Sequence, residues 1–440
     1  MSIFKAYDIR GKYPYELNED IAYNIGKAAA KFFKAKEIAV GRDMRLSGDS
    51  LFTSLSEGIT DMGVDMIDIG LCSSPMASFA SGFLKKPVIM VTASHNPKEY
   101  NGFKIMGAGA KPVSADSGIK DIEKMASSEI EKSSKRGMIV SKNIDKDYIK
   151  HIMKFCRLKD IKMKIVVDTS NGMAGKFLPM VAEKLKSLDI VKMNFKIDGN
   201  FPGHDPNPLK PEIIDILRQR VLKEKADLGV AFDGDADRVF FVSDKGDVVT
   251  SDYITCLIGQ NMLKDNKGGM ILYDLRSSWI VKEFLEAEGG KTKMSKVGHS
   301  FIKEQMRKDN GIFAGELSGH FYFKDNFYAD SGIIGMLQVL CLLSGEGKEM
   351  SELIKPLQKY FSTGELNSDV SDKEGKIKAL KAKYKDGKIS MLDGIRVDYS
   401  DWWFNVRPSN TESLLRLNLE AKSKEIMEEK KKEILDFIRK

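Results

Sequence analysis

Cysteines and long hydrophobic runs are both scarce in this sequence of 440 residues. It has four cysteines, which are Cys72, Cys156, Cys256 and Cys341. They form no CxxC pair, which argues against a zinc ribbon or thioredoxin-like chemistry, and their scatter over a large chain indicates a reducing compartment. The most apolar stretch, residues 332–344, is too short to span a bilayer and contains Gln338, so it predicts a buried helix. The first residues carry charges where a signal peptide needs an apolar run, and we expect a cytoplasmic protein without membrane segments.

The excess of positive over negative charge is also small. Lys and Arg number 70 against 63 Asp and Glu, which leaves a net charge of +7. A basic stripe is missing, so the composition does not support a nucleic-acid partner, and a small anionic substrate is the better interpretation. The 37 glycines and 12 prolines are close to the usual share, which excludes a collagen-like or low-complexity chain. At roughly 150 residues per domain, the length suggests about three domains.

Three segments share one local pattern, in which a short apolar run ends in a polar turn. They cover residues 37–43, 164–170 and 270–276, and helical periodicity follows them over residues 50–62, 175–188 and 278–287. Strands that alternate with helices predict βαβ units with parallel sheets. The runs end at Asp43, Asp168 and Asp274, and this spacing suggests three diverged copies of one α/β domain.

Toward its C-terminal end, from about residue 394, the chain shows a different pattern of predicted elements. Strands are predicted over residues 394–397, 402–406 and 414–419, and a final charged helix over residues 422–439. This combination indicates a smaller α+β domain. Because charge clusters and lapses of apolar periodicity mark domain boundaries, we expect four domains, at residues 1–140, 141–246, 247–355 and 356–440.

The strongest chemical signal is an acidic turn after an apolar run at residues 228–232. Asp233, Asp235 and Asp237 alternate around Gly234, and converging carboxylates suit Mg²⁺ or Ca²⁺ rather than softer metals. A solvated acidic turn is the plain alternative. An EF-hand loop is disfavoured because Arg238 stands where that loop needs glycine and a strand replaces its entering helix.

A second cluster places Ser94 beside His95 at the end of an apolar run. A hydroxyl next to an imidazole is a candidate activated nucleophile, although adjacent residues on a strand point to opposite faces and an ordinary turn is the competing interpretation. The sequence contains no GxSxG motif, which argues against an α/β-hydrolase.

Two further loops are more polar than packing requires. Residues 315–320 place Glu316, Ser318 and His320 between glycines, a composition suited to sugar hydroxyls. Residues 407–411 offer a guanidinium, two hydroxyls and turn amides, which suit a phosphate. Either loop could equally be an ordinary turn.

Together these motifs resemble the α-D-phosphohexomutase family, in particular its phosphomannomutase/phosphoglucomutase branch. Five motifs occur in the family's order: KAYDIRG, TASHNP, DGDADR, GELSGH and RPSNTE. The resemblance covers the whole chain. It implies three related α/β domains with mixed, largely parallel sheets and a smaller C-terminal α+β domain around a central cleft.

The resemblance also implies an isomerase that interconverts hexose 6-phosphate and hexose 1-phosphate, with mannose or glucose as the sugar. Ser94 matches the family's phosphorylated serine, and a phosphoserine oxygen joins Asp233, Asp235 and Asp237 as ligands of one Mg²⁺ per chain. Hexose 1,6-bisphosphate is the implied intermediate and activator. Further residues match groups near the transfer site: Tyr7, Arg10, His95, Lys104 and Arg238.

Sugar contacts are implied for Arg276, His299, Glu316, Ser318 and His320. The loop for the phosphate that is not transferred matches Arg407, Ser409, Asn410 and Thr411. Two departures stand out, because the family commonly has proline at Ser413 and arginine at Trp279. The acid/base group stays open among Lys104, His95 and His320.

Three alternatives stay open: a phosphoglucosamine mutase, a Mg²⁺-dependent sugar-phosphate phosphatase and a non-catalytic Ca²⁺-binding protein. The phosphoglucosamine branch usually reads DNGIK after its serine motif, whereas this chain reads YNGFK at residues 100–104. The sequence does not separate mannose from glucose, and it does not give the oligomeric state.

Overall fold

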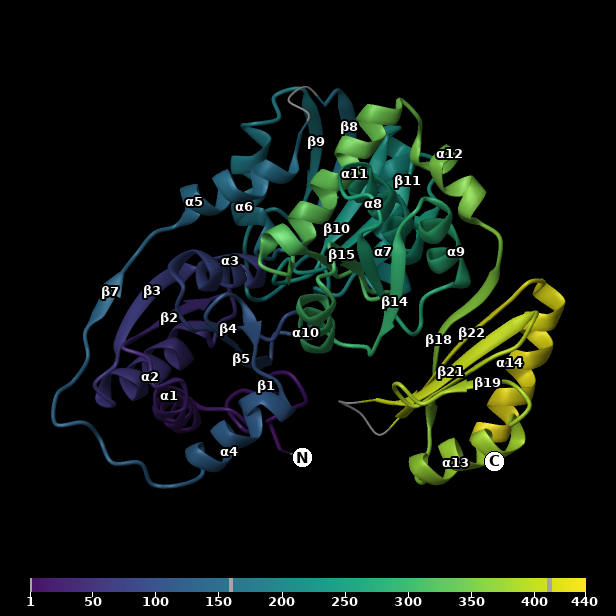
Figure 1. Ribbon diagram of the computed structural model, residues 1–440. Coiled ribbons are helices and arrows are strands. Elements are labelled where there is room, and N and C mark those ends of the chain that lie inside the picture. The colour runs from purple at the N-terminus through teal and green to yellow at the C-terminus, as the bar shows by residue number, and fades with distance from the viewer. Residues whose placement is uncertain (1, 158–160, 410–413) are drawn as a thin grey trace.

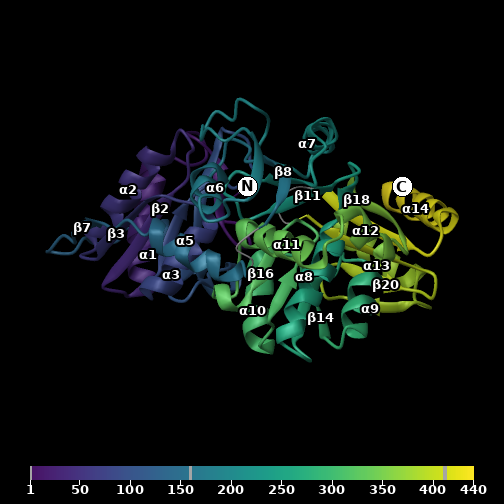
Figure 2. The ribbon, with the colours of Figure 1, turned by 90° about the horizontal axis from the view of Figure 1, so that it is seen from above.

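The computed structural model describes residues 2–157, 161–409 and 414–440. Within these residues, four β-sheets follow one another. The first and fourth domains lie at opposite ends of the molecule in two perpendicular views, with the second and third between them (Figure 1, Figure 2). The chain is therefore an α/β protein with four sheet-centred domains, as the resemblance implies.

The first sheet has the order β1-β5-β4-β2-β3-β7, and β6 pairs with β5. Its strands are β1 (Ile9–Lys12), β2 (Glu37–Arg42), β3 (Asp65–Leu71), β4 (Val88–Val91), β5 (Tyr100–Gly107), β6 (Lys111–Pro112) and β7 (Ile139–Ser141). β2 is parallel to β3 and β4, whereas β5 runs antiparallel to β1 and β4. The helices are α1 (Glu19–Phe33), α2 (Gly48–Asp61), α3 (Ser74–Leu84), η1 (Ala115–Ile119) and α4 (Lys120–Ala126).

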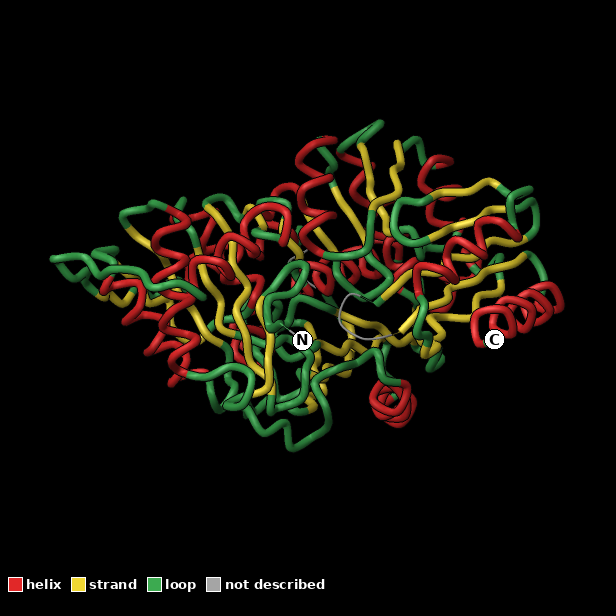
Figure 3. The backbone as a smooth tube through the Cα atoms, turned by 90° about the horizontal axis from the view of Figure 1, so that it is seen from below, coloured by secondary structure: helices red, strands yellow, loops and turns green. Residues whose placement is uncertain are grey.

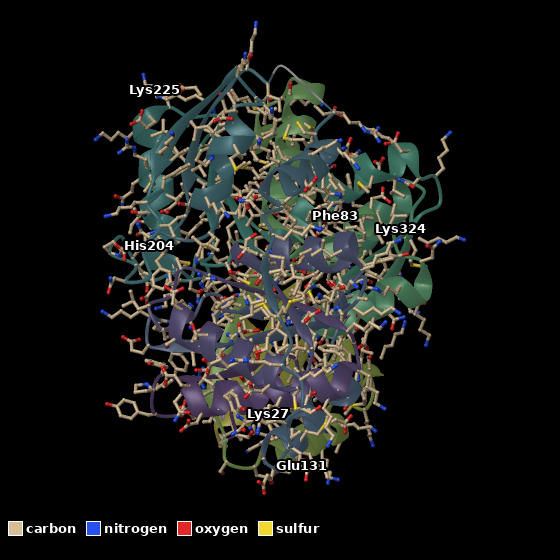
Figure 4. All side chains as sticks on the ribbon, turned by 90° about the vertical axis from the view of Figure 1, so that its left-hand side faces the viewer. Lys27, Phe83, Glu131, His204, Lys225 and Lys324 are labelled. Carbon is tan, nitrogen blue, oxygen red and sulfur yellow. The ribbon has the colours of Figure 1, made fainter. Side chains whose placement is uncertain are left out.

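The second sheet has the order β12-β11-β10-β8-β9. Its strands are β8 (Met163–Asp168), β9 (Leu188–Met193), β10 (Leu228–Phe232), β11 (Val239–Ser243) and β12 (Val248–Val249). The nearby helices are α5 (Asp145–Ile152), η2 (Met153–Phe155), α6 (Ala174–Ala182) and α7 (Pro211–Glu224). His204 and Lys225 lie along the same flank of this part of the molecule (Figure 4).

The predicted helix over residues 175–188 is too long. Helix α6 ends at Ala182, and Leu188 begins strand β9. Strand β9 pairs in parallel with all six residues of β8, and its Ile190 and Val191 are β-branched. Residues 183–187, between α6 and β9, form neither helix nor strand, and the predicted helix overlaps the strand only at Leu188, where pairing with β8 begins.

The third sheet has the order β14-β13-β15-β16-β17. Its strands are β13 (Met270–Asp274), β14 (Lys291–Ser295), β15 (Phe313–Gly315), β16 (Phe321–Phe323) and β17 (Ala329–Asp330). The helices are α8 (Ser251–Asp265), α9 (Trp279–Ala287), α10 (His299–Asp309), η3 (Lys324–Asn326), α11 (Gly332–Glu346), α12 (Met350–Ile354) and η4 (Lys355–Leu357). Helix α11 is buried along most of its length, which confirms the helix predicted for residues 332–344.

The fourth sheet is antiparallel throughout, in the order β18-β22-β21-β20-β19. Its strands are β18 (Phe361–Asp369), β19 (Lys388–Ser390), β20 (Ile395–Asp398), β21 (Trp402–Pro408) and β22 (Leu414–Ala421). Helices α13 (Lys373–Lys383) and α14 (Lys424–Arg439) complete the domain. Figure 3 shows α14 on its outer side, beside the C-terminus. The three strands and the final helix predicted from sequence are present.

One hydrophobic core joins the first three domains. It contains Met76 of α3, Phe177 of α6, Ile254 of α8 and Leu337 of α11, so these domains pack as a continuous body. The fourth domain has its own core around Phe404 and Leu419. Among the described helices, none is both long enough and apolar enough to cross a membrane.

Candidate active site

The Ser94 hydroxyl faces the acidic turn. Strand β4 ends at Val91, and the chain then turns so that Ser94 takes a left-handed backbone conformation with φ of 52°. The Ser94 amide donates to Thr92 Oγ1 at 2.9 Å, which holds this turn. Ser94 Oγ donates to Asp233 Oδ2 at 3.2 Å and lies 3.2 Å from His95 Nδ1. Ser94 and His95 therefore meet because the chain turns at Ser94 rather than continuing as a strand.

The acidic turn is built against the serine turn. Asp233, Asp235 and Asp237 follow β10 directly, and all three are buried. At Gly234, a Cβ atom would lie 2.7 Å from the Ser94 carbonyl oxygen, so only glycine permits this approach. The two turns come from different domains and meet backbone to backbone.

The three carboxylates fit a metal ion. One oxygen from each lies within 4.8 Å of the others. Asp235 Oδ1 is buried and has no hydrogen-bond partner among the described residues. A buried carboxylate oxygen without a partner is costly unless a cation binds it, and oxygen donors suit hard divalent cations. The donor set therefore fits a divalent metal site.

Lys104 of β5 supplies positive charge to this cluster. Its Nζ lies 2.6 Å from Asp235 Oδ2 and 2.5 Å from Asp237 Oδ2. Burial opposes the charge on Lys104, but the two carboxylates outweigh it and raise the pKa of the amine. Burial and the neighbouring Asp237 and Asp235 raise the pKa of Asp233 well above its ordinary value. The cluster thus has more negative charge than one amine neutralises.

Two guanidiniums flank the serine turn. Arg10 Nη1 donates to Asn96 Oδ1 at 2.7 Å, and Arg238 Nε lies 3.8 Å from Asp233 Oδ2. Desolvation, together with Arg238 and Arg10, lowers the pKa of His95 well below its ordinary value, so this imidazole is neutral. The two guanidiniums therefore add positive charge beside Ser94, opposite in sign to the acidic triad.

The third domain brings His320 and Glu316 to the same cluster. His320 Nε2 lies 3.3 Å from Asp237 Oδ1, and its Nδ1 lies 3.4 Å from Glu316 Oε2 and 3.0 Å from Ser318 Oγ. Tyr7 and His299 pack edge to face with ring centroids 5.3 Å apart. Both also line a cavity of about 20 Å³ with Lys104 and Asp237.

A second cationic cluster joins the third and fourth domains. Arg276 Nη2 lies 3.3 Å from Glu316 Oε1, and its Nη1 donates to Glu365 Oε2 at 3.4 Å. Glu365 also accepts from Arg407 Nη2 at 3.0 Å and from Arg416 Nη1 at 3.1 Å. A continuous chain of polar contacts therefore runs from Lys104 in the first domain to Arg407 in the fourth.

The phosphate loop predicted at residues 407–411 is described only in part. Arg407 is buried, and the Ser409 amide donates to the Leu414 carbonyl at 2.9 Å. Asn410 and Thr411 lie outside the described residues, and so does Ser413.

Sequence reasoning missed the partners that hold these groups. Asp43 and Arg45 stand behind the serine turn, and Glu365 stands between three arginines. The sequence did mark Asp43, because this residue ends one of the three repeated apolar runs. Trp279, noted as the loss of a cation, donates its indole Nε1–H to Asp398 of the fourth domain at 2.9 Å. It therefore links the third and fourth domains.

Comparison with known proteins gives consecutive matches along the chain. The phosphoglucomutase/phosphomannomutase alpha/beta/alpha domains I, II and III match residues 1–133, 146–246 and 250–360, and the C-terminal domain of that description matches residues 365–437. The chain belongs to the phosphoglucomutase/phosphomannomutase family. This membership confirms the resemblance drawn from the five motifs.

Relatives of this family match over nearly the whole chain. A phosphomannomutase of Escherichia coli K12 is 38% identical over 435 residues, which covers 96% of this chain and 95% of the relative. A protein named phosphohexose mutases from Xanthomonas campestris is 38% identical and covers 99% of both chains. The crystal structure of a phosphoglucomutase/phosphomannomutase family protein from Burkholderia thailandensis superposes with a TM-score of 0.90 at 32% identity, covering 99% of this chain and 96% of that one.

Proposed function

We propose that this protein is a phosphohexomutase, an isomerase that moves a phosphoryl group between carbon 6 and carbon 1 of a hexose through a phosphoserine at Ser94. The observation that carries the proposal is the geometry of Ser94. Its hydroxyl lies in a buried left-handed turn, 3.2 Å from one carboxylate of an acidic triad on another domain. Family membership supports the reaction, and mannose and glucose phosphates are the proposed substrates.

The acidic triad is the proposed site of one Mg²⁺, with Asp233, Asp235, Asp237 and a phosphoserine oxygen as ligands. When bound, the ion supplies Lewis-acid polarisation of the phosphoryl group. A phosphoserine carries about −1.5 to −2 charges at neutral pH, which adds to three buried carboxylates. The cations contributed by the protein itself are Arg10, Lys104 and Arg238, and they offset this charge around the transferring group.

Phosphoryl transfer needs alignment and charge stabilisation more than covalent chemistry. The phosphoserine gives its phosphoryl group to the free sugar hydroxyl, which leaves a bound hexose 1,6-bisphosphate and the Ser94 hydroxyl. The bisphosphate turns over and returns its other phosphoryl group to Ser94. Lys104, His95 and His320 are the candidates for holding the sugar hydroxyl's proton, and Lys104 and His320 each contact Asp237.

Sugar binding is assigned to the third domain and phosphate binding to the fourth. Glu316 and Ser318 are the proposed hydrogen-bond partners of the sugar hydroxyls, with Arg276 and His299 of the same domain and Tyr7 of the first domain. Arg407, Ser409, Asn410 and Thr411 are the proposed loop for the phosphate that is not transferred. Charge-based contacts of this kind accept the ligand in either of its two orientations.

Hexose 1,6-bisphosphate is the proposed activator, because it can phosphorylate an enzyme molecule that has lost its phosphoryl group to water. The test is a coupled assay with mannose 1-phosphate, glucose 1-phosphate and glucosamine 1-phosphate, each with Mg²⁺ and a trace of hexose 1,6-bisphosphate. We expect hexose 6-phosphate from mannose 1-phosphate or glucose 1-phosphate, and no product from the matched Ser94→Ala variant.

Three results would contradict the proposal. Release of inorganic phosphate without hexose 6-phosphate would indicate a phosphatase instead. A rate with glucosamine 1-phosphate far above the other two would assign the chain to that substrate. Equal rates for Ser94→Ala and the unchanged protein would remove the phosphoserine from the mechanism.

A further inference from the structure

The buried guanidinium of Arg45 lies behind the serine turn and has no role in the reaction proposed above. Arg45 follows strand β2, which pairs with strand β4, and Ser94 lies just beyond the end of β4. The residue is only 3% exposed. A fully buried arginine is costly unless its donors are satisfied, so the groups that it contacts indicate what it does.

Arg45 binds the backbone of the serine turn along its whole length. Its Nη2 donates to the carbonyl oxygens of Ser94 at 2.7 Å and Asn96 at 2.6 Å. Its Nη1 donates to the carbonyl oxygens of Pro97 at 2.8 Å and Tyr100 at 2.9 Å. Four carbonyls that are spread over seven residues thus converge on one planar cation.

A second set of contacts fixes the other side of Ser94. Arg45 Nε lies 3.4 Å from Asp43 Oδ2, and the same carboxylate oxygen accepts from Thr92 Oγ1 at 2.6 Å. Thr92 Oγ1 in turn accepts from the Ser94 amide. Both peptide groups of Ser94 are therefore tied to Arg45, one directly and one through Asp43 and Thr92.

Arg45 also contacts the second domain, which supplies the metal carboxylates. Its guanidinium lies 5.3 Å from the ring centroid of Phe201. A Cβ on Gly199 would come within 2.4 Å of the Met44 carbonyl oxygen, so this loop packs tightly on the backbone next to Arg45. The loop at residues 199–206 reaches the acidic turn through Pro206, whose Cβ lies near Gly234.

We propose that Arg45 is a positioning residue for phosphoryl transfer: it holds the backbone of the serine turn so that the Ser94 Oγ keeps its place against the acidic triad. This inference rests on the proposed function. A left-handed serine costs about 1–2 kcal/mol relative to ordinary conformations, so the turn needs fixed partners to persist. A displacement of about 1 Å in such an arrangement slows transfer by about 100-fold.

The two fates of the phosphoserine distinguish positioning from a merely structural role. In transfer, the sugar hydroxyl oxygen bonds to phosphorus, the bond from phosphorus to Ser94 Oγ breaks, and Oγ receives the hydroxyl proton. In hydrolysis, water takes the place of the sugar, the same bond breaks, Oγ receives a proton from water, and inorganic phosphate leaves. Transfer needs alignment with a bound hydroxyl, whereas water approaches from many directions.

The test is Arg45→Lys in the full chain, phosphorylated at Ser94. Lysine keeps the charge but has three donors on one atom, so it cannot serve four separated carbonyls. We expect kcat to fall by about 30- to 100-fold with KM for the sugar 1-phosphate within about threefold. The fraction of phosphoryl groups lost to water per turnover should rise at least about tenfold, measured as inorganic phosphate against hexose 6-phosphate.

The matched control is Arg42→Lys. Arg42 lies three residues earlier, pairs with Asp49 and stacks on Phe52. The Arg42→Lys substitution should leave kcat and the fraction of phosphoryl groups lost to water unchanged. Thr92→Val supplies a second test if Arg45→Lys does not fold. It removes the acceptor of the Ser94 amide while nearly keeping side-chain shape, and it should raise the same loss to water.

Each outcome decides the proposal. If Arg45→Lys, or Thr92→Val in its place, keeps the wild-type ratio of hydrolysis to transfer, the proposal is overturned. A purely structural role would reduce the amount of active protein and leave that ratio unchanged in the molecules that fold, so this result also overturns it. Failure of the proposed function looks different, because the unchanged protein would then show no phosphoserine or no hexose 6-phosphate.

Discussion

Glu365→Gln tests how the fourth domain is held before substrate arrives. Glu365 accepts from Arg276 of the third domain and from Arg407 and Arg416 of the fourth, at 3.0 to 3.4 Å. Its side chain is 25% exposed, so water screens these ion pairs only in part. Glutamine keeps the shape and removes the charge that all three guanidiniums share.

The magnitude follows from this arrangement. Removing one partner of a well-buried ion pair costs about 3–5 kcal/mol, and partial exposure reduces this to about 1–3 kcal/mol. We expect the unfolding midpoint to fall by about 1–3 °C, because the unfolding entropy of a chain of this length is about 0.9 kcal/mol/K. Without the carboxylate, the three guanidiniums should bind inorganic phosphate about tenfold more tightly, because the negative charge of Glu365 no longer opposes the anion.

The assay is thermal unfolding with and without inorganic phosphate. Glu365→Gln should unfold below the unchanged protein in plain buffer and gain more from added phosphate. Burial raises the pKa of Glu365, but the three arginines outweigh it and lower the pKa. The carboxylate therefore stabilises the protein above its unfolded pKa of about 4.3, and this contribution is lost as pH falls through the lower folded value. The two proteins should converge in acid.

Asp401→Asn is the control, because Asp401 forms an exposed ion pair with Lys422 in the same domain. Its effect should stay below about 0.5 kcal/mol. Equal unfolding midpoints for Glu365→Gln and the unchanged protein, with equal gains from phosphate, would refute the reasoning.

Three further predictions follow from other parts of the site. Asp235→Asn should lower turnover by about 100-fold or more and weaken the Mg²⁺ dependence, while the protein still folds. Steady-state rates measured over a Mg²⁺ titration check this prediction. A titration curve equal to that of the unchanged protein would contradict it. Arg407→Lys should lower turnover and weaken sugar 1-phosphate binding, each by about tenfold or more, with Ser94 phosphorylation unaffected; wild-type kinetic constants would refute the phosphate loop. Burial opposes the charge of His204, but Asp168 outweighs it and raises the pKa, so its stabilisation is complete below about pH 6.5 and is lost as pH rises through the folded value. Thermal unfolding should therefore depend on pH in the unchanged protein and less so in His204→Gln, and equal pH dependence would contradict this.

The sequence predicted those parts of the site in which all the residues come from one short segment of the chain. The acidic turn follows β10 because five buried residues form a strand that ends at Phe232, and the carboxylates come next. The serine turn after β4 follows the same local logic. These motifs were readable because residue type, spacing and strand length all lie within a dozen positions.

Contacts between distant segments were not readable. Arg45 meets carbonyls 49 to 55 positions away, and Glu365 meets Arg276 at a separation of 89. Cys156 and Cys341, scattered in the sequence, have sulfurs 3.4 Å apart. The helix predicted over residues 175–188 extends to the first residue of β9, because the pairing of β9 with β8 is a tertiary contact that local periodicity does not show. Local patterns do not show which distant carbonyl groups Arg45 contacts or which arginines surround Glu365.

Single-turnover transfer from Ser94 tests the central claim most directly. The enzyme is labelled with a radioactive phosphoryl group on Ser94 and mixed with unlabelled mannose 1-phosphate or glucose 1-phosphate and Mg²⁺. The label should leave the protein, appear first in hexose 1,6-bisphosphate and then in hexose 6-phosphate, while Ser94→Ala takes up no label. Label that stays on the protein during turnover, or that appears only as inorganic phosphate, would contradict a mutase that works through this serine.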